Sequence, residues 1–295
     1  MKNIALKKIE ETTWRLLDEL KDELKKYWGD QLLTVFVAGS TAHNDFKLNQ
    51  DVDLLFILND PLAGEDLPKM EDELKSVWRG GLVADVRPAV PLAMEQAFND
   101  IASKYVDDET DVIVKFVIGP YFPKPTKKLT IHLHIISPMS VSLWRIFTKV
   151  YPFHALTMSA KPRVLYGIDP FTITEIKPTL NDIKIWLNVT ARRLDGIEDT
   201  LKTDPRQATL VISKSILHFC VNTLAYLGTY ENNSEQVAEI FKNKILIPLN
   251  SLPKLACFYK KHIEEISNDG VKLQNYLNDA RSFADQLTNY LVAKQ

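Results

Sequence analysis

The residues of this chain with the clearest chemical potential are two aspartates, Asp51 and Asp53, on either side of Val52. The stretch continues as Leu-Leu-Phe-Ile-Leu, which is typical of a buried strand. Side chains alternate across a strand, so both carboxylates would project from one face. Two carboxylates held this close repel each other unless a cation lies between them. Mg²⁺ suits that position, because it commonly takes one or two carboxylates together with substrate phosphate oxygens.

A glycine and a serine precede the aspartates and favour a phosphate. The apolar run 32–38 leads directly into Gly39 and Ser40. Glycine lets the backbone approach a ligand closely, while the serine hydroxyl and the N–H groups that follow suit an anion. Together with the aspartates, this pair predicts a site for a phosphate-bearing ligand complexed with a metal.

The order of these features resembles the nucleotidyltransferase superfamily that includes DNA polymerase beta and the antibiotic-modifying, kanamycin-type nucleotidyltransferases. The resemblance is carried by Ala38, Gly39, Ser40, Asp51, Val52 and Asp53. It implies that Gly39 and Ser40 bind the triphosphate, and that Asp51 and Asp53 are catalytic ligands of Mg²⁺. The implied activity, of EC 2.7.7 type, is transfer of a nucleoside monophosphate, with AMP expected, from ATP or another nucleoside triphosphate. The alternative is a catalytically inactive nucleotide-binding or scaffolding protein that retains this fold.

The superfamily also requires a third acid on the next strand of the sheet, and the sequence offers two placements for that position. Asp85 lies between hydrophobic residues in the predicted strand 82–86 and would serve as general base or third metal ligand. A simpler role for Asp85 is an ion pair with Arg87 at a strand end. The rival placement is the predicted strand 129–136, where His132 and His134 share a face. In that case the third carboxylate is missing and full activity is in doubt.

Hydrophobic periodicity predicts the elements that must position these residues. Residues 4–28 form an amphipathic helix, and strands are expected at 32–38, 52–58, 82–86, 112–118 and 129–136. Further helices are expected at 66–78, 91–105 and 141–150, and a short strand and turn at 162–169. After Pro178 the pattern is helical throughout, with helices at 179–201, 207–227, 234–244, 252–267 and 271–293.

This arrangement predicts an α+β fold with two domains. Residues 1–170 form a nucleotidyltransferase domain with a small mixed β-sheet, and residues 171–295 form an all-α helical bundle. The resemblance to antibiotic-modifying enzymes extends loosely to this helical domain, so an aminoglycoside-like small molecule is one implied acceptor. The hydroxyl of a protein is another.

Composition and charge narrow the partners. A formal net charge of −2 and a pI near 6.3 do not favour long nucleic acid, tRNA included. No segment approaches the length of apolar run that is needed to cross a membrane, and no membrane partner is expected. Cys220 and Cys257 lie in apolar, helical contexts and predict buried thiols in a reducing, cytoplasmic compartment. A homo-oligomer is compatible with the sequence.

Overall fold

The structure, a computed structural model, describes most of the 295 residues. The described residues are 2–42, 44, 46, 49–59, 66–69, 71–72, 75, 92–105, 112–118, 129–135, 139–159, 162–231 and 233–294. Internal contacts divide the chain into two units. The first unit comprises Met1–Tyr151 and Lys161–Ile176, and the second comprises Pro152–Ala160 and Lys177–Gln295.

Six strands of the described chain form one mixed sheet in the first unit. They are β1 (Leu32–Ala38), β2 (Asn49–Leu58), β3 (Val112–Ile118), β4 (Leu129–Ile135), β5 (Met139–Ser140) and β6 (Arg163–Gly167). Their order is β3-β4-β2-β1-β6, and β5 pairs with the far end of β2. The central strand β2 is antiparallel to β1 and parallel to β4. β1 precedes β2 closely in the sequence, whereas β4 follows it by about 70 residues.

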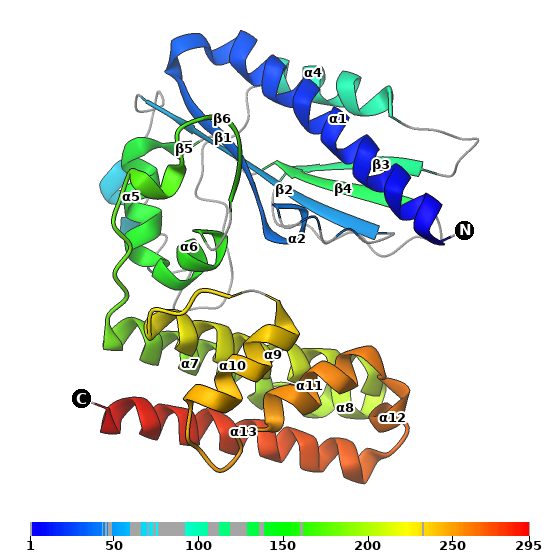
Figure 1. Cartoon of the computed structure of the whole chain (residues 1–295), viewed down its shortest axis with the longest axis vertical. Helices are drawn as coiled ribbons and strands as arrows, with labels where there is room; N and C mark the ends of the chain where they lie inside the picture. Colours follow the sequence, from blue (N-terminus) through cyan, green and yellow to red (C-terminus); the bar gives the residue numbers. More distant parts are fainter. Residues whose placement is uncertain are drawn as a thin grey trace. The chain divides into compact units, whose positions relative to one another are not determined.

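Helices pack on both faces of this sheet. On one face, α1 (Lys2–Trp28) and α4 (Leu92–Ser103) enclose a core with β1, β2 and β4 (Figure 1). On the other face, Trp144 of α5 (Val141–Val150) contacts Phe36 of β1, with ring centroids 5.8 Å apart. The remaining short helices of this unit are η1 (Gly29–Gln31), α2 (Gly39–Ala42) and η2 (Pro170–Thr172).

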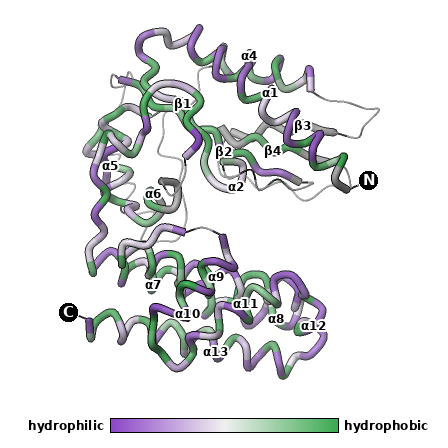
Figure 2. The backbone as a smooth tube through the Cα atoms, in the orientation of Figure 1, coloured by the Kyte–Doolittle hydropathy of each residue, from purple (hydrophilic) through white to green (hydrophobic). Residues whose placement is uncertain are grey.

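The second unit is helical and is organised around α9 (Pro205–Tyr226), which contacts α6, α7, α8, α10, α11, α12 and α13. These helices are α6 (Pro152–Ser159), α7 (Leu180–Asp195), α8 (Glu198–Thr203), α10 (Ser234–Lys244), α11 (Leu252–Lys261), α12 (Glu264–Ser267) and α13 (Gly270–Ala293). Hydrophobic and hydrophilic residues alternate along α13 (Figure 2), as expected for a helix with one packed face. Its packed face includes Phe283, which contacts Phe241 of α10 at 5.4 Å between ring centroids.

One expectation about apolar segments was wrong. By length and composition, α9 is long and apolar enough to cross a membrane. However, 72% of the most apolar 18-residue stretch of α9 is buried, as is typical of the central helix of a packed bundle. Cys220 on this helix and Cys257 on α11 are buried, free thiols, which confirms their predicted burial.

The α+β class, with a small mixed sheet followed by helices, is confirmed, and several elements differ in detail. β2 begins at Asn49 rather than at residue 52, because its pairing with β4 extends to Asn49. The predicted helix 179–201 is divided at Gly196, and the predicted helix 252–267 is divided at His262, whose φ and ψ of −122° and 59° are not helical. Within 141–168 an additional helix, α6, was not predicted. The predicted strand 82–86 and part of the predicted helix 66–78 lie outside the described residues.

Candidate active site

The turn after β1 brings the predicted glycine against one of the predicted aspartates. Ala38, the last residue of β1, pairs with Asp53 of β2 across the antiparallel ladder. Gly39 then adopts a φ of +69°, a conformation that strongly favours glycine. A Cβ added to Gly39 would lie 3.4 Å from Oδ2 of Asp53. The Asp53 carboxylate therefore lies beside the backbone on which a phosphate is predicted to bind.

The two aspartates occupy one face of β2, as their spacing predicts. Val52 and Leu54 are fully buried on the opposite face, in the core beneath α1 and α4. Asp51 is exposed and Asp53 is half-buried. The face that carries them is apolar further along the strand, where α5 contacts β2. Polarity on this face is therefore concentrated at the end of β2 that lies next to α2.

The carboxylates of Asp51 and Asp53 are hard oxygen donors of the kind that Mg²⁺ takes. Within the described part of the chain, no group of three or more His, Cys, Asp or Glu side chains is arranged to hold a metal ion. Two carboxylates from alternate positions of one strand supply hard oxygen ligands and leave the remaining coordination positions to substrate phosphates or water. Asp51 and Asp53 are thus the residues that would hold such an ion.

A buried glutamine connects α2 to the start of β2. Gln50 is 1% exposed, and its side-chain nitrogen Nε2 lies 2.9 Å from Oγ of Ser40 and 2.8 Å from Oγ1 of Thr41. The hydroxyl of Thr41 donates to the carbonyl oxygen of Asp51 at 3.0 Å. Nothing in the sequence singles out Gln50, because a single amide between polar residues gives no periodic signal.

Arg163 anchors the described part of the loop between α2 and β2. Its guanidinium lies 3.6 Å from the centre of the Trp14 ring and donates from Nη1 to Oδ1 of Asn44 at 3.1 Å. Trp14 also contacts the Phe46 ring edge-on, with centroids 5.9 Å apart. Arg163 belongs to the segment 162–169, for which the sequence predicted a strand and turn, and β6 confirms that strand. Its contact with the loop could not be read from the sequence.

The strand next to β2 carries histidines at the positions beside the aspartates. In the parallel pairing of β2 with β4, the Cα of Asp51 is opposite that of His132, and the Cα of Asp53 is opposite that of His134. This is the rival placement that the sequence allowed for the third acid. Asp85, the first choice for that role, lies outside the described residues.

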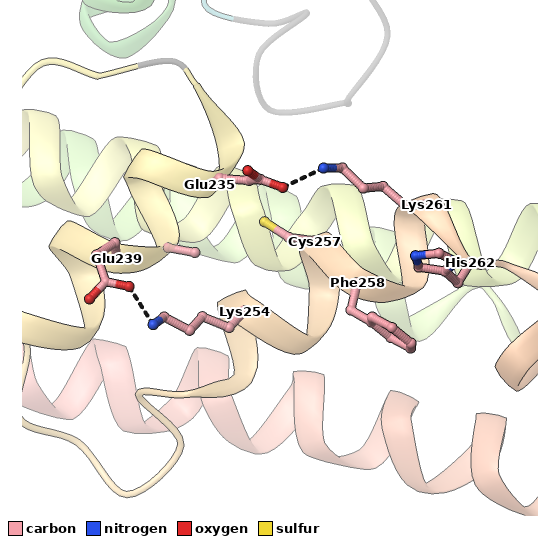
Figure 3. Close-up of a pocket in the computed structure, with 8 residues that line it drawn as sticks. Glu235, Glu239, Lys254, Cys257, Phe258, Lys261 and His262 are labelled. Carbon is pink, nitrogen blue, oxygen red and sulfur yellow. Dashed lines mark hydrogen bonds and ion pairs between the residues drawn. The ribbon is translucent and has the colours of Figure 1, made fainter.

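A separate pocket of about 400 Å³ lies in the second unit, between α10 and α11 (Figure 3). Its lining includes two ion pairs, Glu235 with Lys261 and Glu239 with Lys254, which join the two helices. The Cys257 thiol donates to the carbonyl oxygen of Ser234 at 3.2 Å. The acids and bases that line this pocket therefore already neutralise each other, and none of the predicted site residues lines it.

The β1–turn–β2 arrangement places Gly39 against Asp53 and a carboxylate pair on β2, and the comparison with known families covers this segment. Residues 17–128 match the model of the nucleotidyltransferase domain. Residues 17–128 are therefore similar to a nucleotidyltransferase domain, which confirms the recognition based on Gly39, Ser40, Asp51 and Asp53 for this part of the chain. The match covers β1, α2 and β2 and stops before β4 and the helical unit.

Among solved structures, the chain is similar to spectinomycin adenyltransferase AAD(9) from Enterococcus faecialis, crystallised with ATP and spectinomycin. The identity is 14%, the alignment covers 95% of this chain and 99% of that chain, and the TM-score is 0.44. A similarity of this size carries no argument about the activity of this chain. No curated protein matches the sequence significantly.

Proposed function

We propose that this protein transfers a nucleoside monophosphate, with AMP expected, from a nucleoside triphosphate to a hydroxyl of a small-molecule or protein acceptor, with Mg²⁺ bound by Asp51 and Asp53. The observation that carries the proposal is the position of the Asp53 carboxylate, 3.4 Å from the point where a Cβ of Gly39 would lie. This proximity supports the proposal that Asp53 binds a metal ion which also contacts a phosphate bound at the Gly39 turn.

The reaction would be an in-line displacement at the α-phosphorus of the nucleotide. The acceptor oxygen forms the new P–O bond, the bond between the α- and β-phosphates breaks, and pyrophosphate leaves with the electron pair. When bound, Mg²⁺ would neutralise the negative charge of the phosphates. The backbone at Gly39 and the hydroxyl of Ser40 would orient the triphosphate, so that catalysis arises from positioning and charge neutralisation. The acceptor proton would pass to the group at the third position of the site.

A thermal-shift titration tests nucleotide and metal binding together. ATP, GTP, CTP and UTP are each titrated with and without Mg²⁺ on the wild type and on the Asp51→Asn/Asp53→Asn variant. A nucleotide at a hundred times its Kd adds about 2.7 kcal/mol of stability. We expect a magnesium-dependent shift with one nucleotide, lost in the variant. Asp279→Asn/Asp285→Asn is the matched control, because it removes two exposed acids of α13 in the helical unit. No shift of the wild type with any triphosphate would contradict the proposal.

A second candidate, a nucleotide-binding protein without transferase activity, is favoured by one observation. The positions of β4 opposite Asp51 and Asp53 are His132 and His134, not acids. Two sets of variants separate the candidates, with pyrophosphate release as the readout. Loss of release in Asp85→Asn, with nucleotide binding intact, would support Asp85 as the third acid. If the wild type binds nucleotide without releasing pyrophosphate, and His132→Asp or His134→Asp gains release, the second candidate is supported.

A further inference from the structure

We infer that Gln50 is a positioning residue of the active site: its buried amide orients the Ser40 hydroxyl so that this hydroxyl donates to a phosphate oxygen of the nucleotide. This inference rests on the proposed function and adds to it a residue outside the Gly-Ser and aspartate set. Gln50 lies next to Asp51 in sequence and faces away from solvent, with 1% of its surface exposed.

The orientation of the Gln50 amide follows from its contact with the backbone. One terminal atom of the side chain lies 2.7 Å from the carbonyl oxygen of Asp51. A carbonyl oxygen can only accept a hydrogen bond, so the atom facing it must be the nitrogen Nε2 and not the oxygen. The same nitrogen faces the hydroxyl oxygens of Ser40 and Thr41 at 2.9 Å and 2.8 Å. An amide nitrogen donates and does not accept, so both hydroxyl oxygens face it as acceptors; its two hydrogens serve three acceptors, so one N–H is shared between two of them.

This fixed polarity gives the two hydroxyl groups different roles. Thr41 is fully buried, and its hydrogen is donated within the cluster, to the carbonyl oxygen of Asp51 at 3.0 Å. Ser40 is half-buried and adjoins Gly39, the residue beside the Asp53 carboxylate. Because the Ser40 oxygen accepts from Gln50, its hydrogen is directed away from the amide and can be donated to an anion. If the Ser40 hydrogen were instead donated to the amide side, the lone pairs of its oxygen would face the phosphate oxygen and repel it.

Gln50 also helps to fix the position of the proposed phosphate-binding turn relative to Asp51, a proposed metal ligand. The carbonyl oxygen of Asp51 accepts from both Gln50 and Thr41, so the backbone that carries the Asp51 carboxylate is fixed to α2. Loss of the amide would therefore release Ser40 and loosen the connection between α2 and β2. The first effect changes nucleotide affinity through Ser40, and the second changes it independently of Ser40.

A double-mutant cycle between Gln50 and Ser40 distinguishes these effects. Gln50→Met keeps the length of the side chain and removes the donor, while Ser40→Ala removes the hydroxyl. The dissociation constant of the magnesium-bound nucleotide found in the thermal-shift titration is measured for the wild type, both single variants and the double variant. We expect each single variant to bind about tenfold more weakly, and the double variant to be weakened clearly less than the hundredfold that two independent effects would give.

An additive result, with the double variant about a hundredfold weaker than the wild type, would overturn the inference, because Gln50 would then act without Ser40. If Gln50→Met does not fold, Gln50→Glu replaces it in the cycle, since it keeps the shape and turns the donor into an acceptor. Absence of nucleotide binding by the wild type would refute the proposed function and this role with it. Binding by the wild type together with additivity would refute only the positioning role.

Discussion

The two units of this protein bury polar side chains in different ways. In the first unit, Gln50 bonds to Ser40 and Thr41 of α2 and to the backbone of β2, so one buried amide joins separate elements. In the second unit, Thr209 and Asn222 of α9 donate to carbonyl oxygens four residues earlier in the same helix. Such bonds satisfy a polar group within its own helix. One buried polar contact does join two helices of this unit, the Ser213 hydroxyl of α9 with the Tyr276 hydroxyl of α13 at 3.0 Å.

The difference indicates that the polar contacts of the first unit fix the positions of candidate site residues, whereas the apolar contacts of the second unit stabilise its fold. A polar cluster that joins α2 to β2 fixes the distance between a candidate phosphate contact and a candidate metal ligand. The helical unit instead joins α9, α10 and α13 through a contact of Phe219, Phe241 and Phe283. Changes in the polar cluster at α2 and β2 should therefore alter chemistry more than stability, and changes in the core of the second unit should do the reverse.

The largest expected effect is that of Asp53→Asn. Loss of a carboxylate proposed to hold Mg²⁺ should lower nucleotidyl transfer on the order of 10³-fold, because developing phosphate charge is no longer neutralised. The melting temperature should be equal or higher, because repulsion between Asp51 and Asp53 is removed. Pyrophosphate release and thermal melting on the same samples check both expectations. Retention of transfer by the variant would end the proposed role of the aspartate pair.

The core of the second unit provides the opposite case. Phe283 is fully buried against Phe219 and Phe241, and Phe283→Ala should destabilise that unit by about 3–5 kcal/mol. At temperatures where the variant is folded, its nucleotide affinity should match the wild type. Val271→Ala on the same helix is the control: this side chain is 75% exposed, so its loss should change stability by less than about 0.5 kcal/mol. Urea unfolding and nucleotide titration would reveal a contrary result, namely weaker binding without lower stability.

A matched pair of glycines sharpens the comparison. Gly39 and Gly228 have φ values of +69° and +78°, so alanine at either should cost about 1–2 kcal/mol of stability. A Cβ on Gly39 would lie 3.4 Å from Oδ2 of Asp53, whereas one on Gly228 would meet nothing within 4 Å. Gly39→Ala should therefore weaken nucleotide binding about tenfold, which corresponds to about 1.4 kcal/mol, and Gly228→Ala should not. Equal nucleotide affinity in the two variants would argue against phosphate binding at this turn.

The smallest effect concerns the contact between α1 and the residues that follow α4. Glu19 accepts hydrogen bonds from the hydroxyl of Tyr105 and, at 3.0 Å, from Nζ of Lys104. The bond from Tyr105 is the main cause that holds the pKa of Glu19 below its usual value, while burial above all raises the pKa of Tyr105 to about 12. A lowered carboxylate pKa contributes stability above the unfolded pKa of about 4.5, and this contribution is lost as pH falls through the folded pKa.

Tyr105→Phe should therefore lower the stability of the first unit at pH 7, and the difference from the wild type should shrink below about pH 4. The side chain of Glu19 is 41% exposed, so solvent screening keeps the effect under about 1 kcal/mol. Urea unfolding at both pH values measures it. A difference that grows on acidification would show that the bond to Glu19 is not its source.

Local pattern alone predicted much of the first unit. The limits of β1 and the positions of α4, β3 and α5 follow from runs and periodicities within a few residues of each other. The alternation of Asp51 and Asp53 with buried Val52 and Leu54 is equally local, because a strand has a side-chain period of two. The Gly39 turn belongs to the same group, since its backbone conformation favours the residue type that occupies it.

Only the tertiary structure decided which strand lies beside β2 and which polar residue lies beneath the site. Strand order depends on pairing between segments far apart in the chain, so the sequence could not place His132 and His134 opposite Asp51 and Asp53. The burial of Gln50 likewise results from α2 folding back onto β2, and the same amide on an edge strand would be solvated. The sequence alone determined the types and local spacing of the chemical groups. Long-range packing decided which of them meet, because that depends on contacts between segments with no shared local pattern.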